Sequence, residues 1–136
     1  KFDKKLNFSF SGIKTAVNLI VKKQKKIDSK FKQDLSASFQ NKIIEILSEK
    51  LIKTLKFCKN KRITIKDIVV VGGVASNNAI KNSLKKIANE NNCRFLYPLK
   101  NLCGDNAAMI ALACLLKHQS GIKPDINFIA NPRLNL

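Results

Sequence analysis

The sequence contains 136 residues, of which 45% are apolar, and it carries a formal net charge of +17. That length allows one domain with a hydrophobic core, while the charge predicts a polyanionic partner such as RNA. The sequence has no run of about 18 apolar residues and no signal-peptide core, which excludes a membrane-spanning helix and makes a cytoplasmic protein the expectation.

The basic residues are concentrated in the first half of the chain. Residues 1–66 hold 18 of the 26 basic groups and 5 of the 9 acidic ones. One interpretation is a basic face for nucleic acid. The other is the lysine usage of an AT-rich genome, because 23 of the basic residues are lysines and arginine is the residue favoured for bidentate phosphate contacts. The chain also starts at Lys1 rather than at a methionine, so we expect it to be part of a longer protein.

The cysteines and the single histidine do not form a site by their spacing. Cys58, Cys93, Cys103 and Cys114 include no C-x-x-C pair, which argues against a zinc finger and predicts buried free thiols. His118 stands near a predicted helix end and is the only histidine. The sequence shows no pairing of this histidine with a serine or cysteine nucleophile, so we discard a protease.

The chain opens with a short extended segment and a helix. Residues 8–12 are expected to be extended and to end at an N-cap, with Ser9 or Ser11 as the capping hydroxyl. Apolar residues then recur at helical spacing and predict a helix over residues 13–23, whose last turn is rich in lysine.

A second, longer helix follows a connection. Residues 25–32 lack a core pattern and are expected to be that connection. Apolar residues separated by three or four positions predict one amphipathic helix over residues 32–59. Four lysines of this helix are expected to lie largely away from the apolar stripe and to be solvated: Lys42, Lys50, Lys53 and Lys56.

The centre of the chain combines a strand, two glycines and a helix start. The β-branched run at residues 68–71 predicts a strand buried on both faces. Gly72 and Gly73 end it, where the backbone takes a positive φ or approaches something closely. Residues 76–78 offer N-caps for the next helix. Such a junction directs backbone N–H groups and a helix dipole toward one point and predicts an anion site, with a plain tight turn as the alternative.

A second strand completes a βαβ unit. The helix is expected to run to about Asn91, and a strand over residues 94–97 ends at Pro98. Such short connections favour parallel strands. Because sites in open α/β sheets form beyond the carboxyl ends of the strands, the loops at residues 72–78 and 98–106 are expected to lie at the same edge.

The last predicted helix begins near Asp105, which stands where an N-cap or a first-turn acid is expected. This helix is alanine-rich and apolar on most sides, so we expect it to be buried and closely packed. Gly121 ends it, and the tail to Leu136 is expected to be irregular.

Four strings in sequence order resemble the C-terminal part of the tRNA threonylcarbamoyladenosine transferases, a family formerly named glycoprotein endopeptidases. The strings cover residues 8–17, 34–40, 70–77 and 103–111. The resemblance implies the fold class: α/β, the helix-rich C-terminal lobe of an actin-like ATPase fold with a parallel βαβ unit. Residues 1–136 would then be a single partial domain of a two-lobe enzyme, without its N-terminal lobe.

The resemblance also implies an activity and partners. Members of this family transfer the threonylcarbamoyl group from threonylcarbamoyl-AMP to N6 of the adenosine beside the anticodon of tRNA. The implied partners are tRNA, threonylcarbamoyl-AMP and other proteins of the threonylcarbamoyladenosine synthesis complex, with no membrane.

The site residues follow from the same resemblance. Asn77 matches the family's adenylate-contacting asparagine, and Gly72 and Gly73 support the same loop for ATP or an adenylate. Asp105 matches a ligand of one divalent metal ion, iron or zinc, which is shared with histidines of an H-x-x-x-H motif in the N-terminal lobe. That motif is absent here, so the chain alone is expected to be inactive.

Two positions depart from the family pattern, and two alternatives stay open. Asn7 stands where an acid is usual, and Gly104 stands where threonine is usual beside the metal ligand. The alternatives are another kinase of the actin-like superfamily and a non-catalytic basic RNA-binding fragment.

Overall fold

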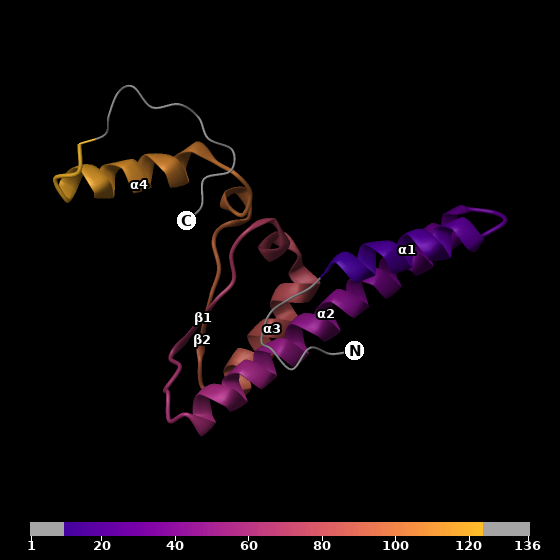
Figure 1. Cartoon of the computed structure of the whole chain (residues 1–136), viewed down its shortest axis with the longest axis horizontal. Coiled ribbons are helices and arrows are strands. Elements are labelled where there is room, and N and C mark those ends of the chain that lie inside the picture. The colour runs from indigo at the N-terminus through magenta and orange to yellow at the C-terminus, as the bar shows by residue number, and fades with distance from the viewer. Residues whose placement is uncertain (1–9, 124–136) are drawn as a thin grey trace. The chain divides into compact units, whose positions relative to one another are not determined.

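The computed structural model describes residues 10–123 (Figure 1). The chain divides into two compact units, Lys1–Cys103 and Gly104–Leu136. Asn7, the extended segment before Phe10 and the tail from Pro124 lie outside the described residues. The elements in chain order are α1 (Ser11–Lys23), α2 (Ser29–Asn60), β1 (Asp67–Val69), η1 (Gly73–Ser76), α3 (Asn78–Glu90), β2 (Arg94–Leu96), η2 (Lys100–Leu102) and α4 (Ala107–Gln119).

Helix α1 is present as predicted, but its start differs. The carbonyl of Phe10 accepts hydrogen bonds from the N–H groups of Ile13 at 3.2 Å and Lys14 at 3.5 Å, so Ser11 already belongs to the helix. The prediction of Ser11 as the N-cap is therefore wrong, and Ser9 lies outside the described residues.

Helix α2 begins three residues earlier than predicted. Asp28 is its N-cap, and the Asp28 carboxylate accepts a hydrogen bond from the N–H of Phe31 at 2.9 Å. The expected connection at residues 25–32 is therefore shorter, because Ser29 is already helical. The predicted end is confirmed, since α2 stops at Asn60.

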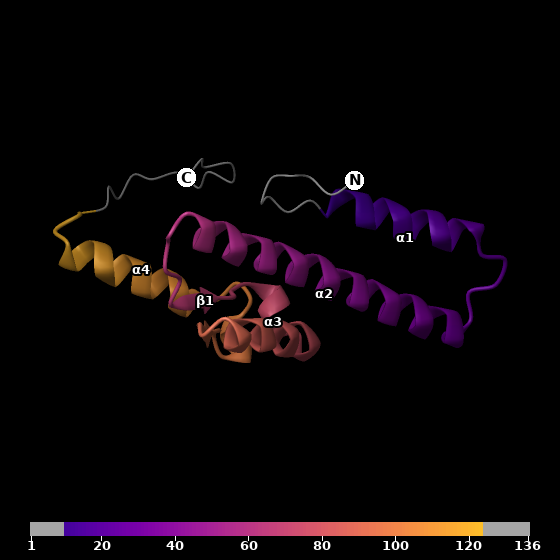
Figure 2. The same cartoon turned by 90° about the horizontal axis from the view of Figure 1, so that it is seen from below.

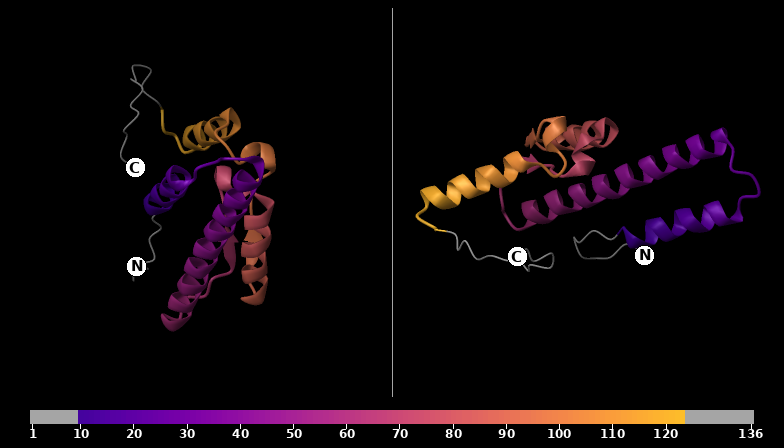
Figure 3. Two further views of the ribbon diagram at one scale, coloured as in Figure 1. Left: turned by 90° about the vertical axis from the view of Figure 1, so that its right-hand side faces the viewer. Right: turned by 90° about the horizontal axis from the view of Figure 1, so that it is seen from above.

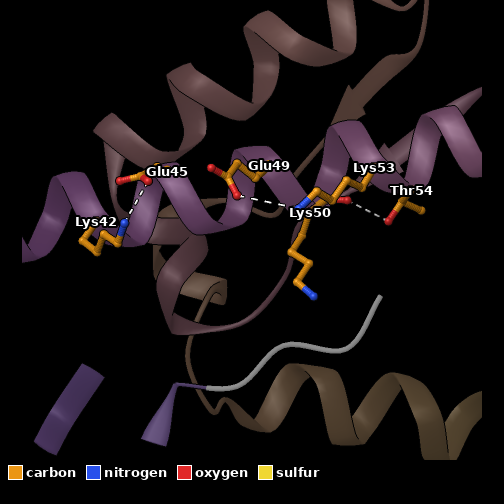
Figure 4. A network of polar contacts seen from close by, with 6 residues as sticks. All are labelled: Lys42, Glu45, Glu49, Lys50, Lys53 and Thr54. Carbon is orange, nitrogen blue, oxygen red and sulfur yellow. Dashed lines mark hydrogen bonds and ion pairs between the residues drawn. The ribbon is translucent and has the colours of Figure 1, made fainter. Parts of the chain in front are cut away.

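The lysines of α2 do not all point to solvent. Lys42 pairs with Glu45 at 2.8 Å and Lys53 with Glu49 at 3.9 Å, both on exposed side chains. Lys50, in contrast, is only 7% exposed, and Figure 4 shows its side chain leaving the helix on another side from these pairs. The prediction of a solvated Lys50 is wrong because residue 50 follows the apolar positions 43 and 47 at helical spacing, which places its aliphatic stem on the packed face.

The predicted parallel βαβ unit is confirmed. Strand β1 pairs with β2 in parallel, with Ile68 opposite Phe95 and Val69 opposite Leu96, and α3 connects the two strands. The N–H of Val70 donates to the carbonyl of Leu96 at 3.0 Å, which extends the pairing by one bond beyond β1.

Within the described residues of the first unit, only one face of this sheet is covered. Ile68 is 9% exposed, whereas Val69 is 60% and Val71 is 70% exposed. The prediction of a strand buried on both faces is therefore wrong. Helices α2 and α3 pack against the face that carries Ile68 and Phe95, and strand alternation turns Val69 and Val71 to the other face.

The core lies between α2, α3 and the sheet. The four predicted apolar residues of α3, Ile80, Leu84, Ile87 and Ala88, are all buried. Helix α3 packs along α2. The N-terminal part of α2 extends beyond α3 (Figure 2, Figure 3). The α2 residues that pack against this core are half-buried and comprise Ile43, Ile44, Leu47, Leu51 and Leu55.

A cross-strand ion pair joins the first residues of β1 and β2. The Arg94 guanidinium donates to both carboxylate oxygens of Asp67, with Nη2 2.8 Å from Oδ2. The hydrogen bond from Arg94 holds the pKa of Asp67 below its usual range, and the positive charges of Arg94 and Lys66 act in the same direction. Because the pair is exposed, we expect its stabilising effect to be small.

We predict that this contribution depends on pH in the acid range. A carboxylate with a lowered folded-state pKa stabilises the fold above its unfolded pKa of about 3.9 and loses that effect as the pH falls through the folded value. The free energy of urea unfolding should therefore be higher for the parent than for Asp67→Asn near pH 7, and the difference should vanish toward about pH 2. A difference that stays constant over this range would contradict the role of the pair.

Helix α4 belongs to the second unit and has no buried residue. The prediction of a closely packed helix is wrong, because residues 104–123 contain no other helix or strand that could cover α4 within its unit. Its predicted end is confirmed. Gly121 has a φ of +77°, and the N–H groups of Gly121 and Ile122 donate to the carbonyls of His118 and Lys117.

The cysteine prediction is confirmed in part. All four cysteines are free, and Cys93 and Cys103 are buried, whereas Cys58 is half-buried and Cys114 is exposed. Across residues 10–123, none of the helices combines the length with the apolar composition of a membrane-spanning segment.

Candidate functional site: a groove beside the glycine loop

The glycine loop adopts the conformation that the sequence suggested. Gly72 has a φ of +84°, which a residue with a side chain rarely adopts. Gly73 opens the short helix η1, which separates the glycines from α3 and was not predicted. A Cβ atom added at either glycine would meet no atom within 4 Å. The space next to both glycines is therefore open to a ligand.

Asn77, one of the three residues expected to offer an N-cap, caps α3. Its Oδ1 accepts hydrogen bonds from the N–H groups of Ala79 at 3.0 Å and Ile80 at 3.2 Å. These two donors are consequently satisfied within the protein. We expected the backbone N–H groups at the start of α3 to be open to an anion. For Ala79 and Ile80 this expectation is wrong, because both N–H groups already donate to the Asn77 side chain.

The same asparagine connects α3 to α2. Its Nδ2 donates to Oε1 of Gln40 at 2.9 Å, and both residues are half-buried. Sequence analysis did not identify Gln40 as a site residue. A contact between residues so far apart in sequence leaves no local pattern. The only sequence feature that pointed to Gln40 was its place at the end of the family-like string of residues 34–40.

A groove of about 1000 Å³ runs along α2, β1, η1 and α3. Its polar groups include Gly73, Ser76 and Asn77 from the predicted loop, together with Ser36 and Gln40 of α2. The other lining side chains are mainly apolar, among them Ile43 and Val74. An apolar groove with a few amide and hydroxyl groups suits an organic ligand that has a flat apolar part and several hydrogen-bond acceptors.

Asp105 lies in the second unit, one residue before the N-cap of α4. The N-cap is Asn106, whose Oδ1 accepts from the N–H of Met109 at 3.0 Å. The prediction of Asp105 as a cap or first-turn acid is therefore wrong by one or more positions. Within the described part of the chain, the Asp105 carboxylate has neither a hydrogen bond nor an ion pair.

Residues 10–123 do not form a metal centre by themselves. They contain no group of three or more His, Cys, Asp or Glu side chains placed to hold one ion. Cations of the kind expected here need several ligands, so Asp105 can supply only one of them. Within the described residues, Asp105 therefore does not make a metal site by itself.

Comparison with known proteins identifies the family. The profile of the tRNA N6-adenosine threonylcarbamoyltransferases matches residues 1–112. The chain belongs to this family. A tRNA N6-adenosine threonylcarbamoyltransferase of Clostridium beijerinckii is 42% identical over 135 residues, and one of Thermosipho africanus is 41% identical over 133 residues.

The match covers most of this chain but a minority of each threonylcarbamoyltransferase. For the Clostridium beijerinckii and Thermosipho africanus proteins, it spans 98% of this chain and 38% of the relative. For the Staphylococcus haemolyticus protein, which is 40% identical, it spans 89% of this chain and 35% of the relative. Membership in the threonylcarbamoyltransferase family also removes the alternative of another actin-like kinase.

Proposed function

We propose that this chain is the C-terminal part of an enzyme that transfers a threonylcarbamoyl group from threonylcarbamoyl-AMP to N6 of the adenosine beside the anticodon of tRNA. The observation that carries the proposal is the family match over residues 1–112. In this reaction the N6 amine attacks the carbamoyl carbon, a C–N bond forms, the bond to the phosphate oxygen breaks, AMP leaves and the amine loses a proton.

The groove is the proposed adenylate site. Gly73 and Asn77 line it, and Gly72 gives the loop its turn. Because the Asn77 Oδ1 caps α3, the side chain offers a ligand only a remaining N–H of Nδ2. The apolar wall suits the adenine ring, and the amide donors suit the acceptor atoms of the nucleotide. ATP shares the adenosine part and would occupy the same groove.

Asp105 is proposed as one ligand of a divalent iron or zinc ion. Its carboxylate is uncommitted in the described residues, as a ligand must be. The remaining ligands would be histidines of the N-terminal lobe, because this sequence contains only His118. Such an ion would hold and polarise the acyl group when bound. This proposal places the chain in the C-terminal lobe of an actin-like ATPase fold.

Charge supports tRNA as the macromolecular substrate. The net charge of +17 attracts a polyanion, and it is greatest in the region that forms α1 and α2. We further propose a cytoplasmic location, where tRNA is modified, and a requirement for the other proteins of the synthesis complex. A non-catalytic RNA-binding chain is the second candidate. It predicts salt-dependent tRNA binding without any adenylate binding.

Activity measurements separate these two functions. The full-length protein, supplied with threonylcarbamoyl-AMP, tRNA and the other proteins of the synthesis complex, should form threonylcarbamoyladenosine, which mass spectrometry of digested tRNA detects. The 136-residue chain by itself should form none, because it supplies a single proposed metal ligand and lacks the H-x-x-x-H histidines. Modified nucleoside formed by the purified chain alone would contradict the proposal that the N-terminal lobe is needed for the transfer.

A further inference from the structure

We propose that Gln40 is a second polar anchor of the groove: it holds the Asn77 amide in one orientation and presents its own N–H groups to the adenylate. The inference rests on the proposed function, because its ligand is the nucleotide that the groove is proposed to bind. Gln40 lies on α2, lines the groove and is half-buried.

The orientation of both amides follows from the helix cap. The backbone N–H groups of Ala79 and Ile80 are donors, so the atom that faces them must be the Asn77 Oδ1. The Asn77 Nδ2 therefore points to Gln40. Two NH₂ groups cannot hydrogen-bond to each other, and so Gln40 must turn its Oε1 toward Asn77, as the 2.9 Å contact shows.

This arrangement leaves the donors of Gln40 available. Its Nε2 carries two N–H groups, and within the described residues no side chain or backbone group accepts from them. The Asn77 Nδ2 retains one further N–H. The two neighbouring amides thus present mainly donors to the groove, which matches a ligand rich in acceptors, such as the ring nitrogens of adenine or the oxygens of an adenylate.

A polar contact elsewhere between α2 and α3 provides a matched control. The hydroxyls of Ser48 and Ser83 lie 3.1 Å apart and are partly buried, but neither residue lines the groove. Ser48→Ala removes one α2–α3 hydrogen bond, as a Gln40 substitution does. It should change the stability of the contact between the helices without changing nucleotide binding.

The test is an AMP titration of the ¹⁵N-labelled full-length protein and its variants, followed by NMR. Gln40→Met, which keeps the length of the side chain but has no amide, should raise the Kd for AMP roughly two- to tenfold. Gln40→Glu keeps an acceptor for Asn77 but loses both donors and adds a negative charge, so it should also weaken binding. Ser48→Ala should keep the parent Kd. An unchanged Kd in Gln40→Met would overturn the ligand contact.

A second readout addresses the orientation of Asn77 in the absence of nucleotide. In Gln40→Met the side-chain NH₂ signals of Asn77 should shift and exchange faster with water, whereas Gln40→Glu should preserve them. Signals that are unaffected in Gln40→Met would overturn the positioning role. If the full-length parent protein does not bind AMP at all, the proposed function and the ligand contact of Gln40 both fail, while the Asn77 signals still decide the positioning role.

Discussion

Replacing Asp105 by alanine in the full-length protein is expected to abolish most of its metal binding and its transfer activity together. The remaining proposed ligands are neutral imidazoles, which hold a divalent cation less well once the carboxylate is gone. Loss of groups that only support a metal ligand typically costs about 10- to 100-fold in affinity or activity, so loss of the ligand itself should cost at least roughly 100-fold. Elemental analysis and the nucleoside assay measure the two effects.

The structure makes this experiment specific. Because Asn106 rather than Asp105 caps α4, Asp105→Ala should leave the helix content unchanged by circular dichroism. Asn106→Ala, in contrast, should lower stability by about 1 kcal/mol through loss of the cap. Glu90→Gln removes an exposed negative charge from the other unit and should retain the metal. An Asp105→Ala protein that keeps its full metal content would refute the assignment.

Substitution of Asn77 is expected to lower adenylate affinity while leaving the metal bound. Asn77→Ala removes the amide and should weaken binding roughly tenfold, since a lost hydrogen bond to a buried partner costs about 1 to 3 kcal/mol. It also removes the cap of α3, at about 1 kcal/mol of unfolding free energy. Calorimetry with the adenylate, urea unfolding and elemental analysis separate the three quantities.

Asn77→Asp separates the cap from the ligand contact. Aspartate retains an oxygen for the N–H groups of Ala79 and Ile80, and Gln40 can turn its Nε2 toward the second carboxylate oxygen. Stability should therefore stay close to that of the parent. Adenylate binding should still fall, because the donor is lost and a negative charge faces an anionic ligand. Normal adenylate affinity together with lost metal would contradict the assigned role of Asn77.

Features governed by local sequence were predictable. The burial of Ile80, Leu84 and Ile87 follows from their helical spacing. A positive φ was one of the two roles expected of the glycine pair, and Gly72 adopts it. A cap within residues 76–78 was expected because serine and asparagine are favoured before a helix, and Asn77 is the residue that forms it. These features depend on residues a few positions apart, which periodicity and cap preferences describe.

Features governed by distant contacts were not predictable. Helical spacing places Lys50 on the apolar stripe of α2 while its residue type favours solvent, and only the packed fold shows that the side chain is buried. The exposed Val69 shows that a β-branched run indicates a strand but not how many of its faces will be covered. At Asp105 and Asn106, two residues with similar cap preferences stand side by side, so sequence alone does not decide which one caps α4.

The contact between Gln40 and Asn77 illustrates the limit for the site itself. The loop residues Gly73 and Asn77 were identified from sequence, and the structure places both at one groove. Gln40 comes from α2 and reaches Asn77 only because α2 packs along α3. The place of Gln40 in the groove could therefore be found only from the folded structure.

The central claim is that the groove beside the glycine loop binds the adenylate. The most direct test is a map of the backbone and side-chain NMR signals that shift when AMP is added to the unsubstituted full-length protein. Among the signals of residues 10–123, we expect the largest shifts at Gly72, Gly73, Asn77 and Gln40, and none of that size with inorganic phosphate alone. AMP-dependent shifts confined to other parts of the chain, or equal shifts with phosphate, would contradict it.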